Sequence, residues 1–257
     1  MLNQLRKIAE TAGGLFSEHR LSEIDQKEGH ANFVTNIDRE VEDYLQSALL
    51  KLVPGSRMIG EEKENDSLSD LPTWIVDPVD GTTNLIHGYR MSAVSIALCE
   101  GEEPVLGLVW QPWSKEMFLA EKGKGATLNG SPIHVSAHPF DRALIAFGTS
   151  PYNPDLAEKS MSAALEFLLK CADIRRSGSA ALDLAYLACG RHDAFFELSL
   201  KPWDYAAGSL LVREAGGCFH MPLTEGAPRY DLSTAVAAST PACEEAFLRV
   251  LRGHLGT

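Results

Sequence analysis

Hydrophobic residues near the start of the chain recur with helical spacing. Between residues 2 and 16 they stand three or four positions apart, which predicts an amphipathic helix. A second stripe of this spacing runs from Val41 to Leu49 and stops at Pro54-Gly55. Asp38 stands where a residue that caps the start of this helix is expected. The first part of the chain is therefore predicted to supply two helices, each with one buried face.

Shorter apolar runs, rich in β-branched residues, come next. The run at residues 73–76 predicts a buried strand that ends at Asp77-Pro78. Three further strands are predicted at close spacing, at residues 93–99, 105–110 and 116–120. Asn129-Gly130 then marks a turn. The first half of the chain is thus expected to be rich in antiparallel meanders.

From about residue 136 the pattern changes to alternating strands and helices. The predicted strands are 144–147, 173–176, 193–197 and 235–238, and the predicted helices are 155–171, 180–189, 204–215 and 242–251. The change of pattern predicts a layered α+β protein with two subdomains, residues 1–135 and residues 136–257. We expect the first to carry the metal-binding motifs and the second to complete the active site.

Composition adds limits to this picture. The chain has 257 residues, of which 45% are hydrophobic, enough for a substantial core. It contains no apolar run of the length that a membrane span needs and no signal peptide pattern at its start. The five cysteines are dispersed and form no C-x-x-C pair, which favours free thiols in a reducing cytoplasm.

The charge balance is strongly acidic, with 35 acidic against 23 basic residues and a net charge of −12. This balance makes nucleic acid an unlikely main partner, because a phosphate backbone requires a basic surface. An acidic protein that acts on an anionic substrate would also face repulsion. A divalent cation would remove that repulsion, so the charge is compatible with a metal-dependent enzyme.

The most informative stretch is residues 74–84, where a buried strand leads into Asp77, Pro78 and Asp80. The rigid proline can turn the chain so that both carboxylates meet at one point. Such oxygen ligands suit Mg²⁺ or Mn²⁺ and not zinc. The amides of residues 81–83 can form an anion-binding nest. By itself, Asp-Pro-x-Asp-Gly is more often a plain turn than a metal site.

Three other segments are ambiguous when each is considered alone. The glutamate pair of Gly60-Glu61-Glu62 is usually solvated surface or a helix start. Residues 32–38 fit a strand followed by the helix cap Asp38, and residues 203–208 fit a helix start capped by Asp204. Each segment separately favours a structural interpretation.

Taken together, these segments resemble the motifs of the inositol monophosphatase family, the lithium-sensitive magnesium phosphatases. Residues 32–38 match its first motif with Asn32 in place of an aspartate, and residues 60–62, 74–84 and 203–208 match the others. Order and spacing agree from about residue 27 to residue 217. The resemblance implies a layered αβαβα fold of the sugar-phosphatase type, with mixed sheets sandwiched by helices, and a homodimer.

The resemblance also implies a metal site. Glu61, Asp77 and the carbonyl of Val79 would hold one ion, and Asp77, Asp80 and Asp204 a second. Glu61 would share a weaker third ion. The cofactor is therefore expected to be two or three Mg²⁺ ions per site, with Mn²⁺ as a substitute.

Catalytic and substrate residues follow from the same resemblance. Thr82 and Asp38 would orient and deprotonate a water, with Glu61 as the third catalytic residue. The residues implied to contact the substrate are Asp80, Gly81, Thr82, Thr83, Ser179, Ala180, Glu197 and Asp204. The substrate would be a small phosphate ester, with inositol monophosphate favoured over fructose 1,6-bisphosphate, histidinol phosphate, nucleotide 3′-phosphates and NADP.

Two other functions remain as alternatives. His134 and His138 have the spacing of a helical zinc pair, but their β-like, proline-flanked surroundings favour surface histidines. The second alternative is a regulatory protein of RNA metabolism that keeps the phosphatase fold. Arg175-Arg176 and the helix predicted after them resemble the bacterial subgroup of the family to which such proteins belong. Salt-dependent association with RNA would support that alternative.

Overall fold

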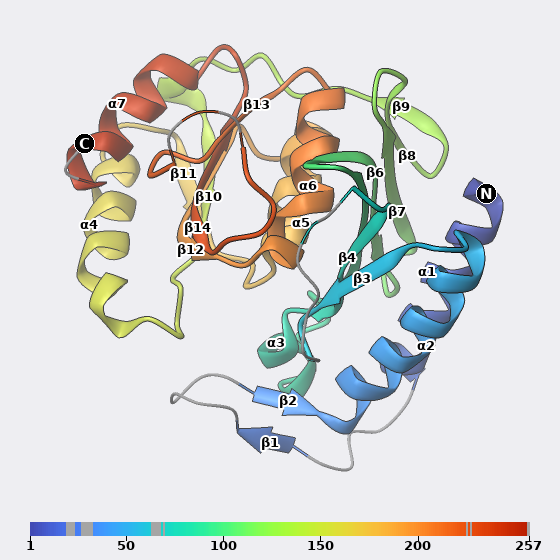
Figure 1. Cartoon of the computed structure of the whole chain (residues 1–257). Coiled ribbons are helices and arrows are strands. Elements are labelled where there is room, and N and C mark those ends of the chain that lie inside the picture. The colour runs from blue at the N-terminus through green and yellow to red at the C-terminus, as the bar shows by residue number, and fades with distance from the viewer. Residues whose placement is uncertain are drawn as a thin grey trace.

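A computed structural model describes residues 1–18, 24–26, 33–62, 68, 70–224, 226 and 228–255. Its larger sheet has seven strands in the order β3-β4-β5-β6-β7-β8-β9 (Figure 1). The strands are β3 (Arg57–Gly60), β4 (Thr73–Asp80), β5 (Ala93–Glu100), β6 (Glu103–Gln111), β7 (Glu116–Glu121), β8 (Gly125–Leu128) and β9 (Ser131–Ile133). Only β3 and β4 pair in parallel within this sheet. The predicted meander is confirmed, and the Asn129-Gly130 turn joins β8 to β9.

Helices α1 (Leu2–Glu18) and α2 (Asn36–Leu52) cover the outer face of the seven-stranded sheet. Both predicted helices are confirmed, and each buries an apolar stripe. The predicted cap is wrong by three positions. Thr35 caps α2, and the side chain of Asp38 accepts a hydrogen bond from the Thr35 amide at 2.9 Å. This reciprocal capping box leaves the other oxygen of Asp38 available for a tertiary contact.

The smaller sheet has five strands in the order β11-β10-β12-β14-β13. They are β10 (Leu144–Phe147), β11 (Asp173–Arg175), β12 (Ala194–Leu200), β13 (Cys218–His220) and β14 (Thr234–Ser239). Strands β11, β10 and β12 are parallel, whereas β14 pairs antiparallel with both β12 and β13. The four strands predicted here are confirmed. The three-residue β13 follows a glycine pair and was not predicted.

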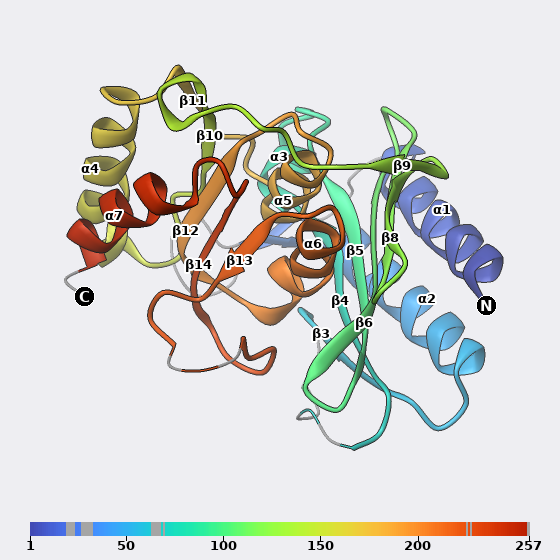
Figure 2. The same ribbon diagram turned by 90° about the horizontal axis from the view of Figure 1, so that it is seen from above.

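Five layers result, in the order αβαβα (Figure 2). Helices α5 (Ala180–Ala188) and α6 (Pro202–Glu214) fill the space between the sheets, while α4 (Ala157–Leu168) and α7 (Glu244–Leu255) cover the far side of the smaller sheet. The short elements are β1 (Ile24–Gln26), β2 (Phe33–Thr35), α3 (Thr82–Ile86) and two 3₁₀ turns, Phe140–Arg142 and Pro154–Leu156. The predicted layered fold is confirmed. The division at residue 136 stays a prediction.

Close packing of α6 on the larger sheet depends on one glycine. A side chain at Gly107 in β6 would place its Cβ 2.7 Å from the backbone oxygen of Ala207 in α6. The helix therefore lies directly on the strand, and its first turn is held at a fixed height above the sheet. That first turn carries Asp204.

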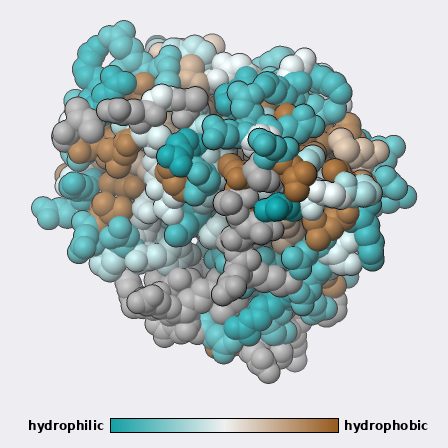
Figure 3. Space-filling view, in the orientation of Figure 1, coloured by the Kyte–Doolittle hydropathy of each residue, from teal (hydrophilic) through white to brown (hydrophobic). Residues whose placement is uncertain are grey.

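An apolar stripe on the surface follows one helix. Figure 3 shows it on the left, over α4, where Met161, Leu165, Leu168 and Leu169 are 44% to 76% exposed. In the described part of the chain, no helix has both the length and the apolar character that a membrane crossing requires.

Candidate active site

Two of the predicted metal ligands lie at a bulge in β4. This strand continues past Val76 to Asp80, so the predicted strand end is wrong. The register with β5 shifts between Asp77 and Asp80, because Pro78 has no N–H for the ladder. The Val79 amide donates to Asp77 at 2.9 Å and closes the bulge. The irregularity directs both carboxylates toward one point.

The third carboxylate comes from the start of α6. The sequence suggested Asp204 as the helix cap, but Lys201 holds that position and Asp204 stands three residues further on. One oxygen of Asp204 accepts a hydrogen bond from the Lys201 amide at 2.7 Å. One carboxylate oxygen from each of Asp77, Asp80 and Asp204 lies within 4.8 Å of the others.

Electrostatics make this cluster unstable without a cation. Burial raises the pKa of Asp77 well above its usual value, and the charges of Glu61, Asp80 and Asp204 raise it further. Burial and the neighbouring carboxylates raise the pKa of Asp204 in the same way. For Asp80, burial raises the pKa to about 6, against hydrogen bonds from Ser179 and the following amides. Buried oxygen ligands that repel one another fit a hard divalent cation.

Thr82 connects the cluster to the start of α2. Its hydroxyl lies 2.9 Å from Asp38 Oδ1 and 3.2 Å from the Val79 carbonyl, and the carboxylate is the stronger acceptor. The other oxygen of Asp38 is occupied by the capping box. The pair that the resemblance predicted is thus in contact, and its orientation is fixed by α2. Residue 32 of the same motif lies outside the described residues.

The loop before α5 approaches the cluster from the opposite side. Ser179 caps α5 and its hydroxyl donates to Asp80, which also accepts the Ala181 amide at 2.9 Å. Gly81 has a left-handed backbone (φ 90°), and a Cβ there would lie 2.9 Å from the Met91 carbonyl and 3.2 Å from the Gly178 carbonyl of this loop. Glycine is therefore required where this loop passes the start of α3.

Glu197 lies on β12 at the same cavity. It accepts the Ser150 amide at 2.7 Å, and burial raises its pKa to about 7. A side chain at Gly148 would collide with this carboxyl. The residue that follows β10 must therefore be glycine for Glu197 to occupy this place.

The predicted residues converge on one cavity of about 520 Å³ with a narrow arm of about 80 Å³. The cavity is lined by Glu61, Asp77, Val79, Asp80, Gly81, Thr82, Glu197 and Asp204. Thr83, Ser179 and Ala180 line the arm. Of the predicted residues, only Asp38 touches neither space, and it acts through Thr82. Several lining residues were not predicted as site residues, among them Tyr152, Asp183, Lys201 and Trp203.

The histidine alternative is not supported. His134 and His138 are exposed, and His138 Nδ1 pairs with Asp193 at 2.9 Å. In the described ranges the only group of carboxylate, histidine and cysteine ligands close enough to hold a metal is the aspartate cluster.

The chain is similar to known proteins along nearly its whole length. A model of the inositol monophosphatase family matches residues 2–255. The chain is 38% identical to Nus factor SuhB of Escherichia coli K12, over 99% of this chain and 97% of that protein. It is also 38% identical to inositol monophosphatase 3 of Solanum lycopersicum, over 95% of this chain and 94% of that protein. The solved IMPase of Thermotoga maritima has a TM-score of 0.89 at 30% identity, covering 99% of this chain and 98% of that chain.

The αβαβα layers and the buried carboxylate cluster define a protein of the sugar-phosphatase fold class. Within that class, the chain belongs to the inositol monophosphatase family.

Proposed function

We propose that this protein is a Mg²⁺-dependent phosphomonoesterase that hydrolyses a small polyol or sugar phosphate. The observation that carries the proposal is the convergence of Asp77, Asp80 and Asp204 within 4.8 Å, at a site where burial and neighbouring carboxylates raise the pKa values of Asp77 and Asp204. Such a site attracts divalent cations and, once neutralised, a phosphate dianion. No serine or cysteine nucleophile is required, because positioning and electrostatics supply the catalytic effect.

The metal ligands in this proposal are the three aspartates, Glu61 and the carbonyl of Val79. Bound Mg²⁺ would supply a water of lowered pKa and neutralise charge on the phosphate and leaving oxygen. Asp77 would help to hold both ions, since Glu61 and both other aspartates lie close enough to raise its pKa. Mn²⁺ has the same preference for oxygen ligands and is the expected substitute.

The chain's own residues would then orient the reacting groups. Thr82, held by Asp38 at 2.9 Å, would fix the attacking water, and Asp38 would take the proton of that water through the Thr82 hydroxyl. The amides of Gly81, Thr82 and Thr83 at the start of α3 would bind the phosphate oxygens. Hydroxyls of the leaving group would meet Ser179, Ala180 and Glu197.

A panel of esters tests the reaction and its substrate. Phosphate release would be measured for inositol monophosphate, fructose 1,6-bisphosphate, histidinol phosphate, a nucleotide 3′-phosphate and NADP, with Mg²⁺, with Mn²⁺ and with a chelator. We expect Mg²⁺-dependent release, fastest from inositol monophosphate. Absence of release from every ester, while calorimetry records bound Mg²⁺, would contradict the proposal.

A regulatory role is the second candidate, because the similarity to Nus factor SuhB extends over nearly the whole chain and Arg175-Arg176 is exposed. The net charge of −12 opposes direct contact with RNA. RNA binding that weakens steeply with salt, together with an inactive ester panel, would favour this role.

Assembly and location are part of the same proposal. A homodimer is supported by the exposed apolar stripe of α4, and the mass of the protein in solution would test it. A cytoplasmic location is supported by the five cysteines, all of them in the described part of the chain and all free. Inhibition by lithium would be measured in the phosphate-release assay.

A further inference from the structure

Tyr152 lies at the junction of the active-site cavity and its narrow arm, and it lines both spaces. Among the described residues it is the only aromatic side chain that the two linings share. The lining of the arm also contains Ser179, Ala180 and Glu197, which are the residues that the proposed function assigns to the leaving group. Tyr152 therefore borders the place proposed for the leaving group.

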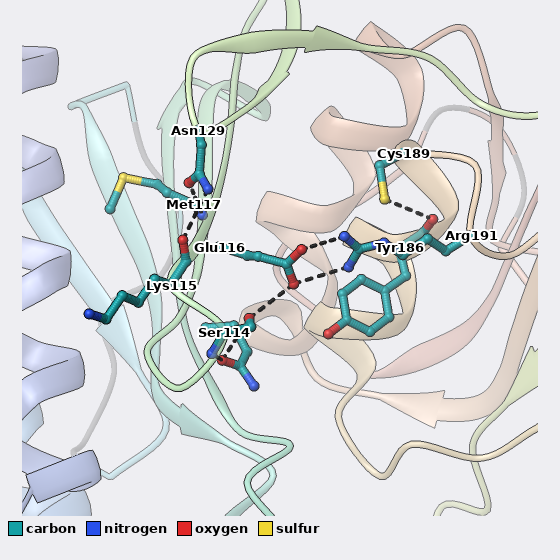
Figure 4. Close-up of polar contacts among 9 residues, drawn as sticks. Ser114, Lys115, Glu116, Met117, Asn129, Tyr186, Cys189 and Arg191 are labelled. Carbon is teal, nitrogen blue, oxygen red and sulfur yellow. Dashed lines mark hydrogen bonds and ion pairs between the residues drawn. The ribbon is translucent and has the colours of Figure 1, made fainter.

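The Tyr152 side chain differs from other tyrosines of the protein in having no partner. Figure 4 shows the guanidinium of Arg191 beside the Tyr186 ring, 4.8 Å from the ring centroid. Tyr205 and Tyr230 pack ring against ring, with their centroids 5.8 Å apart. Tyr152 is 59% exposed, and within the described ranges no aromatic ring, cation or hydrogen-bonding group pairs with it. A single exposed tyrosine is ordinary on a protein surface, so exposure alone gives Tyr152 no role.

The backbone of Tyr152 belongs to a tight turn that follows β10. The Asn153 amide donates to the Ser150 carbonyl at 2.9 Å, so residues 150–153 form a four-residue turn. Pro151 occupies the second position, where its ring fixes the backbone, and Tyr152 occupies the third. Because the turn is held before a ligand arrives, little further ordering is needed for the tyrosine ring to bind one.

The first residue of this turn is strained and is fastened to β12. Ser150 is buried and has a left-handed backbone (φ 44°), which is costly for a residue with a side chain. Its amide donates to Glu197 at 2.7 Å, and its Oγ accepts the Ser199 amide at 3.0 Å. The hydroxyl proton is shared between Glu197 Oε1 at 3.3 Å and the Ser199 carbonyl at 3.2 Å. These bonds hold the strained residue and tie the turn of Tyr152 to the carboxyl proposed to meet the leaving group.

An aromatic ring in this position favours one shape of leaving group. A cyclic polyol or sugar has C–H groups on the faces of its ring and hydroxyls at the rim, so an aromatic face can cover the ring while polar groups bind the rim. Ser179 and Glu197 supply such polar groups in the same arm. An acyclic alcohol has no comparable face to cover.

We propose that Tyr152 is a specificity-determining residue whose ring packs on a cyclic leaving group in the arm, so that the substrate is the phosphate ester of a ring polyol or sugar and not of an acyclic alcohol. The proposal rests on the phosphatase function proposed above and narrows its substrate class. Ser150 has a supporting part, because it fixes the turn that presents the ring.

Kinetics of Tyr152→Ala and Tyr152→Phe test the contact. In Tyr152→Ala the KM for inositol monophosphate should rise about tenfold, while the KM for glycerol 2-phosphate should change less than about twofold. The kcat should change little, because the substitution alters none of the clustered carboxylates. Tyr152→Phe keeps the ring and should stay within about twofold of the wild type for both esters. Equal KM changes for the two esters in Tyr152→Ala would overturn the proposal, as would a loss in Tyr152→Phe as large as that in Tyr152→Ala.

Tyr89→Ala is the matched control. Tyr89 is 62% exposed, close to the value for Tyr152, and lies outside both linings, so its variant should leave both KM values unchanged. A phosphonate analogue of inositol monophosphate, which cannot be hydrolysed, gives a second measurement by calorimetry. Its Kd should rise about tenfold in Tyr152→Ala, and an unchanged Kd would contradict the contact. If the wild type hydrolyses neither ester, the proposed function fails, and the Kd of the phosphonate still decides the role of Tyr152.

Discussion

Thr82 and Asp38, 44 positions apart in the chain, are joined by a hydrogen bond of 2.9 Å between the threonine hydroxyl and Oδ1 of the aspartate. The second oxygen of Asp38 is held by the Thr35 amide at 2.9 Å, so the carboxylate is locked to the start of α2. Asp38 is 1% exposed. Asp38 therefore completes the helix cap and also fixes Thr82, which lines the cavity of the candidate active site.

Loss of this contact should reduce rate more than metal affinity. For Thr82→Ala we expect kcat to fall about 100-fold, because a positioned proton-transfer pair contributes that much or more. The Kd for Mg²⁺ from calorimetry should change little, since none of the clustered carboxylates is altered. Thr82→Ser keeps the hydroxyl and should remain active. A variant that loses metal binding and keeps kcat would contradict this role.

Removing one charge from the cluster should abolish turnover without unfolding the protein. Asp77→Asn and Asp204→Asn each take away a ligand and also relieve repulsion among buried carboxylates. We expect no Mg²⁺-dependent phosphate release and a metal-free melting temperature equal to or above that of the wild type. The exposed Asp173 offers a control as Asp173→Asn, which should be fully active. Activity retained in both cluster variants would refute the metal assignment.

Stability of the metal-free protein should fall as pH rises. Burial raises the pKa of Asp80 to about 6 and that of Glu197 to about 7. A folded-state pKa above the unfolded value means that the folded protein binds the proton more tightly, so stability present at low pH is lost as pH rises. The loss should run from about pH 4 to about pH 7 and reach the order of 3 kcal/mol per group. Urea midpoints measured with a chelator would record this loss of stability. Added Mg²⁺ should reverse the part of the loss that arises from Asp80. A metal-free midpoint that is flat across this range would disprove the effect.

The close packing of α6 on the larger sheet can be tested at Gly107. Gly107→Ala would bring a Cβ to 2.7 Å from the Ala207 oxygen, so α6 and Asp204 must shift. We expect about 1–3 kcal/mol of destabilisation, as for an overpacked core, with reduced activity. Gly14→Ala in α1 meets no atom within 4 Å and should be neutral or stabilising. Equal effects of the two substitutions on the urea midpoint would show that close packing at Gly107 is unimportant.

The sequence alone determined most of the element types and indicated which residues to expect at the candidate site. Helical periodicity predicted α1 and α2, and β-branched runs predicted the strands of the meander, because these patterns arise from which face of a local element is buried. The motif at residues 74–84 indicated that Asp77 and Asp80 could meet at one point, since a proline between two aspartates constrains the chain locally. The other expected ligands, Glu61 and Asp204, came from the resemblance to the family. The errors lay at boundaries, where Asp38 and Asp204 were placed as caps and stand three residues inside, and in short elements such as β13, which was not predicted.

Only the tertiary structure decided how distant segments meet. The contact of Asp38 with Thr82 and the approach of Ser179 to Asp80 depend on how α2, α5 and α6 pack against the two sheets. The physical reason is that periodicity reports which side of an element is buried, whereas the partners across a layer are selected by close packing between elements far apart in the chain.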